Sequence, residues 1–265
     1  MNIFLRELKA HWRSLIIWCV VILFLVVSAM AKFQSYSETG QSMTELLSHM
    51  PRALRIVLGM GNLDLATAGG FYGMFYLYLL LMAGIHASML GAGIIAKEER
   101  DKTTEFLIAK PVSRERVISS KLLAALFNIL VYNIVTLVFS LAIVGQYAGG
   151  EDVTNEILLM MAGMFMLQLI FLSIGAGTAA LSRRPKGAGS IATAILLGTY
   201  VISAASGIDS RLDGLKYITP FKYFDAEQLI RDGSFQPVFV ILSAVIVAAM
   251  VCVTYVFYKK KDLGI

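Results

Sequence analysis

The sequence predicts an all-α, polytopic membrane protein with six transmembrane helices. Of its 265 residues, 57% are hydrophobic and only 15% are charged, and the mean hydropathy is +0.72, which is more apolar than a water-soluble domain of this length. The apolar residues gather into six runs that contain no Asp, Glu, Lys or Arg, as expected if each such charge costs about 2.5–3.5 kcal/mol at the bilayer centre. These runs are residues 14–31, 71–96, 122–147, 157–181, 188–208 and 237–258.

Each run has the length and the pattern of a membrane-spanning helix. The runs hold between 18 and 26 residues, and a helix that rises about 1.5 Å per residue needs about 20 residues to cross a hydrocarbon core of about 30 Å. Strands of an outer-membrane barrel would alternate apolar and polar residues, and these runs do not alternate. We see no linker or internal repeat, so we expect one transmembrane domain over residues 1–265.

The first run follows a short amphipathic segment. Residues 1–14 separate an apolar face from a basic face at helical spacing, with Trp12 suited to headgroup depth, so we expect an N-terminal interfacial helix that lies on the inner surface. A charged anchor that only fixes topology is the alternative. Basic residues followed by an apolar run also resemble a signal peptide, but the run exceeds the usual 7–15 residues, so we expect it to be retained.

Two polar loops carry amphipathic segments on the opposite side of the membrane. Residues 32–70 have apolar side chains at helical spacing on both sides of Pro51, which predicts two short interfacial helices. Residues 207–237 combine acidic side chains with Tyr and Phe, which are typical of the headgroup region. We expect short amphipathic helices or a partly re-entrant segment there.

The basic residues give an orientation. With a cytoplasmic N-terminus, the inner segments hold 16 of the 23 Lys and Arg residues and the outer loops hold the other seven. The positive-inside rule therefore predicts that both termini and residues 97–121 lie in the cytosol.

The chain lacks the residue patterns of an enzyme. It has no G-x-x-x-x-G-K-[ST] motif, and its apolar runs contain no Asp or Glu, no H-E-x-x-H and one histidine, so we predict no catalytic residue, no metal site and no cofactor. Two G-x-G-x-x-A strings, residues 91–96 and 175–180, lie inside apolar runs and predict close helix–helix contacts. The same contact is predicted by a stripe of small residues at Gly84, Ala87, Ser88 and Gly91.

Five polar side chains stand out within the apolar runs. His86 is either a neutral ring bonded to a neighbouring helix or a proton or substrate site. Asn128, Tyr132 and Thr136 recur every four residues and therefore share one helical face, and Gln168 is polar at mid-depth of the next run. These residues either form interhelical hydrogen bonds or line a translocation path or subunit seam.

The cytoplasmic segment of residues 97–121 is far longer than a simple connection needs. Its first residues continue the second span as a solvated helix, and the apolar residues 106–108 then lie in the cytosol. Pro111 ends the helix, and Ser113 caps a new helix with Glu115 in its first turn. An apolar cluster ringed by charge needs burial in lipid headgroups or in a protein groove, and we favour a protein.

The stretch EERDKTTEFLIAKPVSR, residues 98–114, resembles the cytoplasmic signature of type-2 ATP-binding-cassette (ABC) transporter permeases. In that family, acidic residues precede a Thr-x-x-Leu-like turn and then Pro-Val-Ser-Arg, although many members have Gly where this chain has Thr103. The helix order, the outer segments 50–60 and 218–226 and the short basic C-terminus are also similar to the family. The matching positions are Glu98, Glu99, Thr104, Glu105, Leu107, Pro111, Val112, Ser113 and Arg114.

The resemblance implies a membrane-spanning permease subunit that exports a hydrophobic or amphipathic substrate from a bacterial or archaeal cell. It implies a second permease subunit, identical or related, and two separate ATPase subunits that bind ATP and Mg²⁺, so this chain is itself no enzyme. Membrane lipids surround it and no nucleic acid is a partner. The substrate would cross along the seam between the permeases. The implied coupling helix docks on an ATPase through Glu98, Glu99, Thr104, Glu105, Phe106, Leu107, Pro111, Val112, Ser113 and Arg114.

Two other functions are less well supported by the residues. A stand-alone secondary transporter or channel usually has broken helices and intramembrane charges near the midplane, and this sequence shows neither. A membrane-embedded enzyme or an assembly factor depends on His86 alone.

Overall fold

A computed structural model of the chain describes residues 3–39, 50–101, 112–182 and 185–260. Across these residues the chain is helical and has no strand, and six helices are long and apolar enough to cross a membrane. The prediction of an all-α protein with six spans is therefore confirmed. The six are α1 (Ile3–Thr39), α4 (Ala68–Arg100), α6 (Arg114–Tyr147), α7 (Thr154–Leu181), α8 (Ala188–Ile208) and α11 (Pro237–Lys260).

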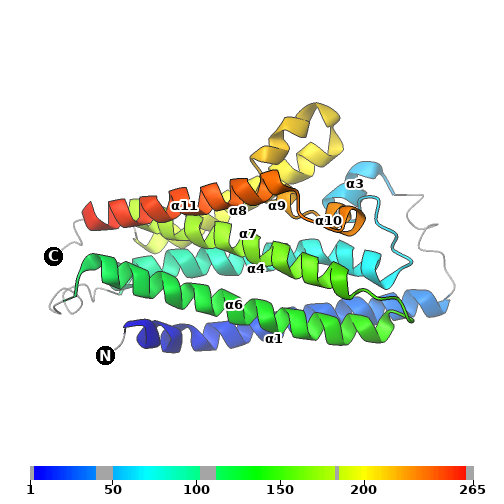
Figure 1. Cartoon of the computed structure of the whole chain (residues 1–265), viewed down its shortest axis with the longest axis horizontal. Helices are drawn as coiled ribbons and strands as arrows, with labels where there is room; N and C mark the ends of the chain where they lie inside the picture. Colours follow the sequence, from blue (N-terminus) through cyan, green and yellow to red (C-terminus); the bar gives the residue numbers. More distant parts are fainter. Residues whose placement is uncertain (1–2, 40–49, 102–111, 183–184, 261–265) are drawn as a thin grey trace.

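The spanning helices run lengthwise through one bundle (Figure 1). Helix α1 begins and α11 ends at the same end of the bundle, while α3 (Arg52–Val57) and α10 (Ala226–Asp232) lie toward the other end. Helix α4 packs along α7, α1 along α6, and α11 along α7. The pair α4 and α7 thus forms the centre of the bundle, and its apolar stretches are the most buried of the six.

Small residues let α4 and α7 approach closely. A Cβ atom built at Gly91 would lie 2.2 Å from the carbonyl oxygen of Leu172, and one at Gly175 would lie 2.2 Å from that of Ser88. Real side chains cannot occupy such positions, so the two backbones meet directly at these glycines. The prediction that the glycine-containing strings mark a helix–helix contact is confirmed.

The segment before the first span does not form a helix of its own, so the predicted interfacial helix is not confirmed. Helix α1 runs without a break from Ile3 to Thr39, and no Gly or Pro in this range would interrupt it. Glu7 on its second turn is fully buried, so tertiary contacts hold the start of the helix against the bundle.

The helices on either side of residues 102–111 extend beyond their apolar runs, as predicted. Helix α4 continues to Arg100, and α6 begins at Arg114. Ser113 is the N-cap of α6, where its side chain accepts a hydrogen bond from the backbone N–H of Arg116 at 3.3 Å, and Glu115 is in the first turn. Residues 102–111, including Pro111, lie outside the described residues.

The end of the bundle opposite the chain termini carries short helices. Of the two helices predicted within residues 32–70, the structure describes α3, and residues 40–49 lie outside the described part. The second loop forms η2 (Ser210–Tyr217), α9 (Pro220–Tyr223) and α10, in agreement with short helical segments. The Tyr223 hydroxyl donates a hydrogen bond to the carbonyl of Tyr217, and burial raises the pKa of this hydroxyl.

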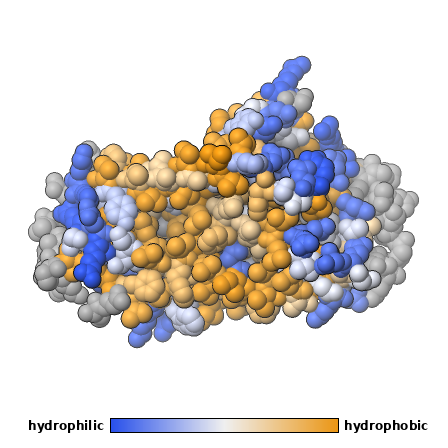
Figure 2. All heavy atoms as spheres, in the orientation of Figure 1, coloured by the Kyte–Doolittle hydropathy of each residue, from blue (hydrophilic) through white to orange (hydrophobic). Residues whose placement is uncertain are grey.

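The surface matches a membrane environment. Figure 2 shows apolar side chains across the middle of the molecule and hydrophilic side chains gathered toward its two ends. Large apolar side chains are exposed on the outer faces of α1, α6, α8 and α11, as expected for contact with lipid or with another apolar surface. They include Ile17, Phe24, Leu123, Val138, Val201, Ile241 and Val245.

Candidate functional site

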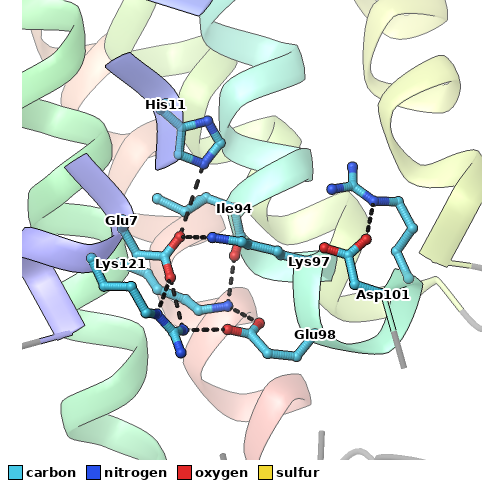
Figure 3. Close-up of polar contacts among 9 residues, drawn as sticks. Glu7, His11, Ile94, Lys97, Glu98, Asp101 and Lys121 are labelled. Carbon is cyan, nitrogen blue, oxygen red and sulfur yellow. Dashed lines mark hydrogen bonds and ion pairs between the residues drawn. The ribbon is translucent and has the colours of Figure 1, made fainter. Parts of the chain in front are cut away.

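A cluster of buried charges joins three helices at the end of the bundle where α4 ends and α6 begins. We call it the basal ion cluster (Figure 3), and it contains Arg6 and Glu7 of α1, Lys97 and Glu98 of α4, and Lys121 of α6. Glu7 and Lys121 are fully buried, and Glu98 is 4% exposed. Charged residues are almost never buried to this extent unless they are paired.

Glu7 and Glu98 are the two carboxylates of the cluster. The Glu7 carboxylate accepts hydrogen bonds from Lys97 Nζ at 2.9 Å and from Arg6 Nη2 at 2.8 Å. Arg6 Nη2 also donates to Glu98 Oε1 at 2.9 Å, which ties α1 to α4. These are charge-assisted bonds, which are roughly twice as strong as bonds between neutral groups.

Lys121 completes the cluster from α6. Its ammonium group donates to the Glu98 carboxylate and, at 2.6 Å, to the backbone carbonyl of Ile94. Ile94 lies one turn before Glu98 on α4, so both acceptors lie on the same face of that helix. The Lys121 side chain therefore fixes the start of α6 to the end of α4.

The neighbouring residue His11 extends the cluster along α1. Its Nε2 atom is 3.9 Å from the Glu7 carboxylate, and Figure 3 shows the ring directed toward that group. The next turn of α1 thus lies against the same acidic centre.

A second set of contacts, which we call the C-terminal clamp, joins the start of α6 to the end of α11. Arg114 Nη1 donates to the backbone carbonyl of Lys259 at 3.0 Å, and the Lys259 side chain forms an ion pair with Glu115. One turn further on, the hydroxyls of Ser119 and Tyr255 are 2.7 Å apart. The described residues on either side of 102–111, the end of α4 and the start of α6, are therefore both anchored to other helices.

The predicted coupling residues fall into three groups in the structure. Glu98 is buried in the basal ion cluster, whereas Glu99 and Val112 are half-buried and Ser113 and Arg114 are exposed at the start of α6. The other five lie outside the described residues: Thr104, Glu105, Phe106, Leu107 and Pro111.

Sequence reasoning missed Glu7 and Lys121. Both were counted only as charges, Lys121 as one of the basic residues that set the orientation. In the sequence, Glu7 stands out only as an acid among basic residues, and Lys121 only as a lysine directly before the apolar run 122–147. Their pairing became visible only when the fold brought α1, α4 and α6 together.

A second polar group lies deep in the membrane part of the bundle. The His86 ring stacks on Tyr132, with 4.9 Å between ring centroids and 21° between planes, and Trp18 of α1 lies 5.4 Å from His86. Asn128 lies one turn before Tyr132 on α6 and is 3% exposed. The Nδ1 atom of His86, the Oδ1 atom of Asn128 and the hydroxyl of Tyr132 have no hydrogen-bond partner among the described residues.

The remaining two predicted polar residues form hydrogen bonds. Thr136 donates to the carbonyl of Tyr132 within α6 at 2.8 Å, and Gln168 of α7 accepts from Asn133 of α6 at 2.6 Å. The structure thus places Asn128, Tyr132 and Thr136 on one buried face of α6, as predicted. Gln168 forms an interhelical bond with Asn133, a residue that the sequence analysis had not singled out.

The comparison with known families covers nearly the whole chain. The model of the ABC-2 family transporter proteins matches residues 1–263. No match was found among curated proteins. The matched range includes the basal ion cluster, the C-terminal clamp and the segment between them.

Proposed function

Since the chain belongs to the ABC-2 transporter family, it is a membrane-spanning permease subunit that works with an ABC ATPase, and we propose that it exports a hydrophobic or amphipathic compound. In this proposal two ATPase subunits supply the ATP hydrolysis and a second permease, identical or related, completes the pathway. Both termini lie in the cytosol, which is supported by the distribution of Lys and Arg.

The site of coupling is the segment of residues 97–114. Its apolar residues 106–108 sit between charged stretches, which suits a groove on an ATPase. The observation that carries the proposal is the basal ion cluster, because it fastens the end of α4 and the start of α6 to each other and to α1. A force on this segment therefore acts on three helices at once.

The motion passes from the ATPases to the membrane through these contacts. Closure of the ATPase pair displaces the segment, and α4 and α6 carry the displacement inward as rigid levers. The basal ion cluster transfers it to α1, and the C-terminal clamp transfers it to α11. Glu7, Glu98 and Lys121 are buried and have little freedom to reorient, whereas the clamp residues Arg114 and Glu115 are exposed.

Glu98 has a positioning role in this mechanism. Its carboxylate is directed to Lys121 and Arg6 and is 4% exposed, so it holds the base of the segment and does not touch the ATPase. Contact with the ATPase falls to the residues beyond it, chiefly Glu105, Phe106 and Leu107.

A groove between α4 and α8 supports an amphipathic substrate. It has a volume of about 520 Å³, and small side chains such as Ala92, Gly93 and Ala194 form its wall. Arg100 and Lys186 lie at the end nearest the cytoplasmic segment. An apolar wall with a basic mouth suits a molecule that has an apolar body and an anionic or polar head, drawn from the inner leaflet.

The test uses a charge reversal on the segment and a matched reversal elsewhere. Glu105→Lys is expected to abolish substrate-stimulated ATP hydrolysis by the complex purified from native membranes, while membrane insertion stays normal. Asp213→Lys, on exposed η2 at the other end of the bundle, is expected to leave hydrolysis unchanged. Full stimulated hydrolysis by the Glu105→Lys complex, or substrate movement by the purified chain alone without nucleotide, would contradict the proposal.

A further inference from the structure

A polar pocket lies at the end of the bundle farthest from the basal ion cluster. It is enclosed by α3, the end of α8, and the α9–α10 region, and its volume is about 120 Å³. It takes no part in the coupling mechanism proposed above. Its lining residues include Arg52, Arg55, Asn62, Lys222, Asp225 and Glu227.

Specific contacts fix the wall that α3 provides. The hydroxyl of Tyr200 on α8 donates to the carbonyl of Val57 at 2.8 Å. A Cβ atom at Gly207 would lie 2.8 Å from Ile56, so α8 needs a glycine where α3 crosses it. Helix α3 is thereby held against α8, so the backbone that carries the pocket-lining side chains of α3 has a fixed position.

The opposite wall is fixed by Glu227 of α10. Its carboxylate accepts from the backbone N–H of Asn62 at 3.2 Å and from the Asn62 side-chain amide at 2.9 Å. Gly61 has a positive φ of 45°, and a Cβ atom there would lie 2.6 Å from Glu227 Oε2. The loop after α3 is therefore shaped around this carboxylate.

The acidic side chains of the pocket have hydrogen-bond donors in the protein, whereas its two arginine side chains have no acceptor among the described residues. Asp225 accepts from Lys222 Nζ at 2.8 Å and from the backbone N–H of Glu227 at 3.1 Å, so both acids already have protein donors. The guanidinium groups of Arg52 and Arg55 form no hydrogen bond or ion pair with the described residues, and the Nε atom of Arg55 is buried without an acceptor among them. A buried donor left without a partner costs about 1–3 kcal/mol, and more if it is charged.

We propose that this pocket binds a phosphate-type anion through the guanidinium groups of Arg52 and Arg55, with Lys222 as an additional donor. The two arginines are three residues apart on α3 and so lie on the same side of the helix. Guanidinium groups bind phosphate through two parallel hydrogen bonds, which would give Arg55 Nε the acceptor that the described residues do not supply.

The surroundings of the pocket fit two sources of such a group. A smaller cavity of about 60 Å³ shares Ile56, Gly59, Lys222 and Asp225 with the pocket and continues between α4 and α8, where Leu77 and Leu80 are part of its lining. An anionic phospholipid could place its phosphate at the arginines and an apolar part along this cavity. A free phosphate from the aqueous side would need only the arginines.

The binding experiment separates these sources and does not depend on transport. The purified full-length chain in detergent is titrated with dihexanoyl phosphatidylglycerol, with inorganic phosphate and with uncharged dihexanoylglycerol, and binding is followed by native mass spectrometry and thermal unfolding. We expect saturable binding of phosphatidylglycerol, of phosphate or of both, and weaker binding of dihexanoylglycerol. Phosphatidylglycerol alone would assign a lipid headgroup, and phosphate alone would assign a free solute.

Variants connect the binding to the pocket. Arg52→Gln combined with Arg55→Gln is expected to weaken binding at least tenfold. Arg55→Lys is expected to weaken binding less, because lysine keeps the positive charge but cannot donate two parallel hydrogen bonds from a planar group. Arg211→Gln with Lys216→Gln removes two cations from η2 at the same end of the molecule, outside the pocket, and should leave affinity unchanged. Absence of binding to both anionic probes, or equal affinity in wild type and the Arg52/Arg55 double variant, would overturn the proposal.

Discussion

Lys121→Met tests the energetic role of the basal ion cluster. Methionine has a similar length but no charge, so the substitution removes the donor to Glu98 and to the Ile94 carbonyl. Breaking a buried ion pair by removing one partner costs about 3–5 kcal/mol. Because Arg6 still contacts Glu98, we expect a loss in the lower part of this range, about 3 kcal/mol.

The assay is unfolding of the purified chain by titration with a denaturing detergent, followed by circular dichroism. Lys186→Met is the matched control, because Lys186 is exposed at the same end of the bundle, and its expected effect is within about 0.5 kcal/mol. A double variant, Lys121→Met with Glu98→Gln, should lose less stability than the sum of the single changes. An effect of Lys121→Met no larger than that of Lys186→Met, or strict additivity in the double variant, would refute the reasoning.

Two further predictions concern the interior of the bundle. Gly91→Leu should prevent correct assembly of α4 on α7, because the backbone of Leu172 occupies the space that the new side chain needs. Gly93→Ala should be tolerated, because no neighbouring atom lies within 4 Å of the added Cβ. The two variants are compared by their monodispersity in size-exclusion chromatography, and equal profiles would contradict the packing argument. His86→Phe should retain transport, measured in native membrane vesicles, because a phenyl ring preserves the stack on Tyr132; complete loss would instead assign a chemical role to the imidazole.

The sequence predicted the spanning helices well because the bilayer imposes a strong and local rule. Charged residues are excluded from the hydrocarbon region, so the six apolar runs stand out without any knowledge of packing. The continuation of α4 to Arg100 was predicted, but α1 also continues to Thr39 although its apolar run ends at residue 31, because polar residues that leave the hydrocarbon can continue the same helix. For the same reason, the prediction divided α1 into an interfacial helix and a span. The charge pattern near Glu7 marks a change of environment, but the helix continues through it.

The candidate site was only partly predictable. Ser113 could be recognised as a helix cap because capping depends on residues a few positions away. The contact between Glu7 and Lys97 joins residues 90 positions apart, and no periodicity within one segment reports it. Gln168 likewise has a partner, Asn133, that is set by how α6 and α7 pack, so its polarity indicated a hydrogen bond without identifying the second residue.

We propose that the segment between the basal ion cluster and the C-terminal clamp receives the motion of an ATPase, and the other steps of the mechanism depend on this contact. It is tested most directly by placing a photo-crosslinking amino acid at Leu107 in the complex within native membranes and comparing cross-linked products with and without ATP. We expect cross-links to the ATPase subunit whose yield changes with nucleotide. Cross-links from Leu107 only to phospholipid, in a complex that still hydrolyses ATP in response to substrate, would contradict it.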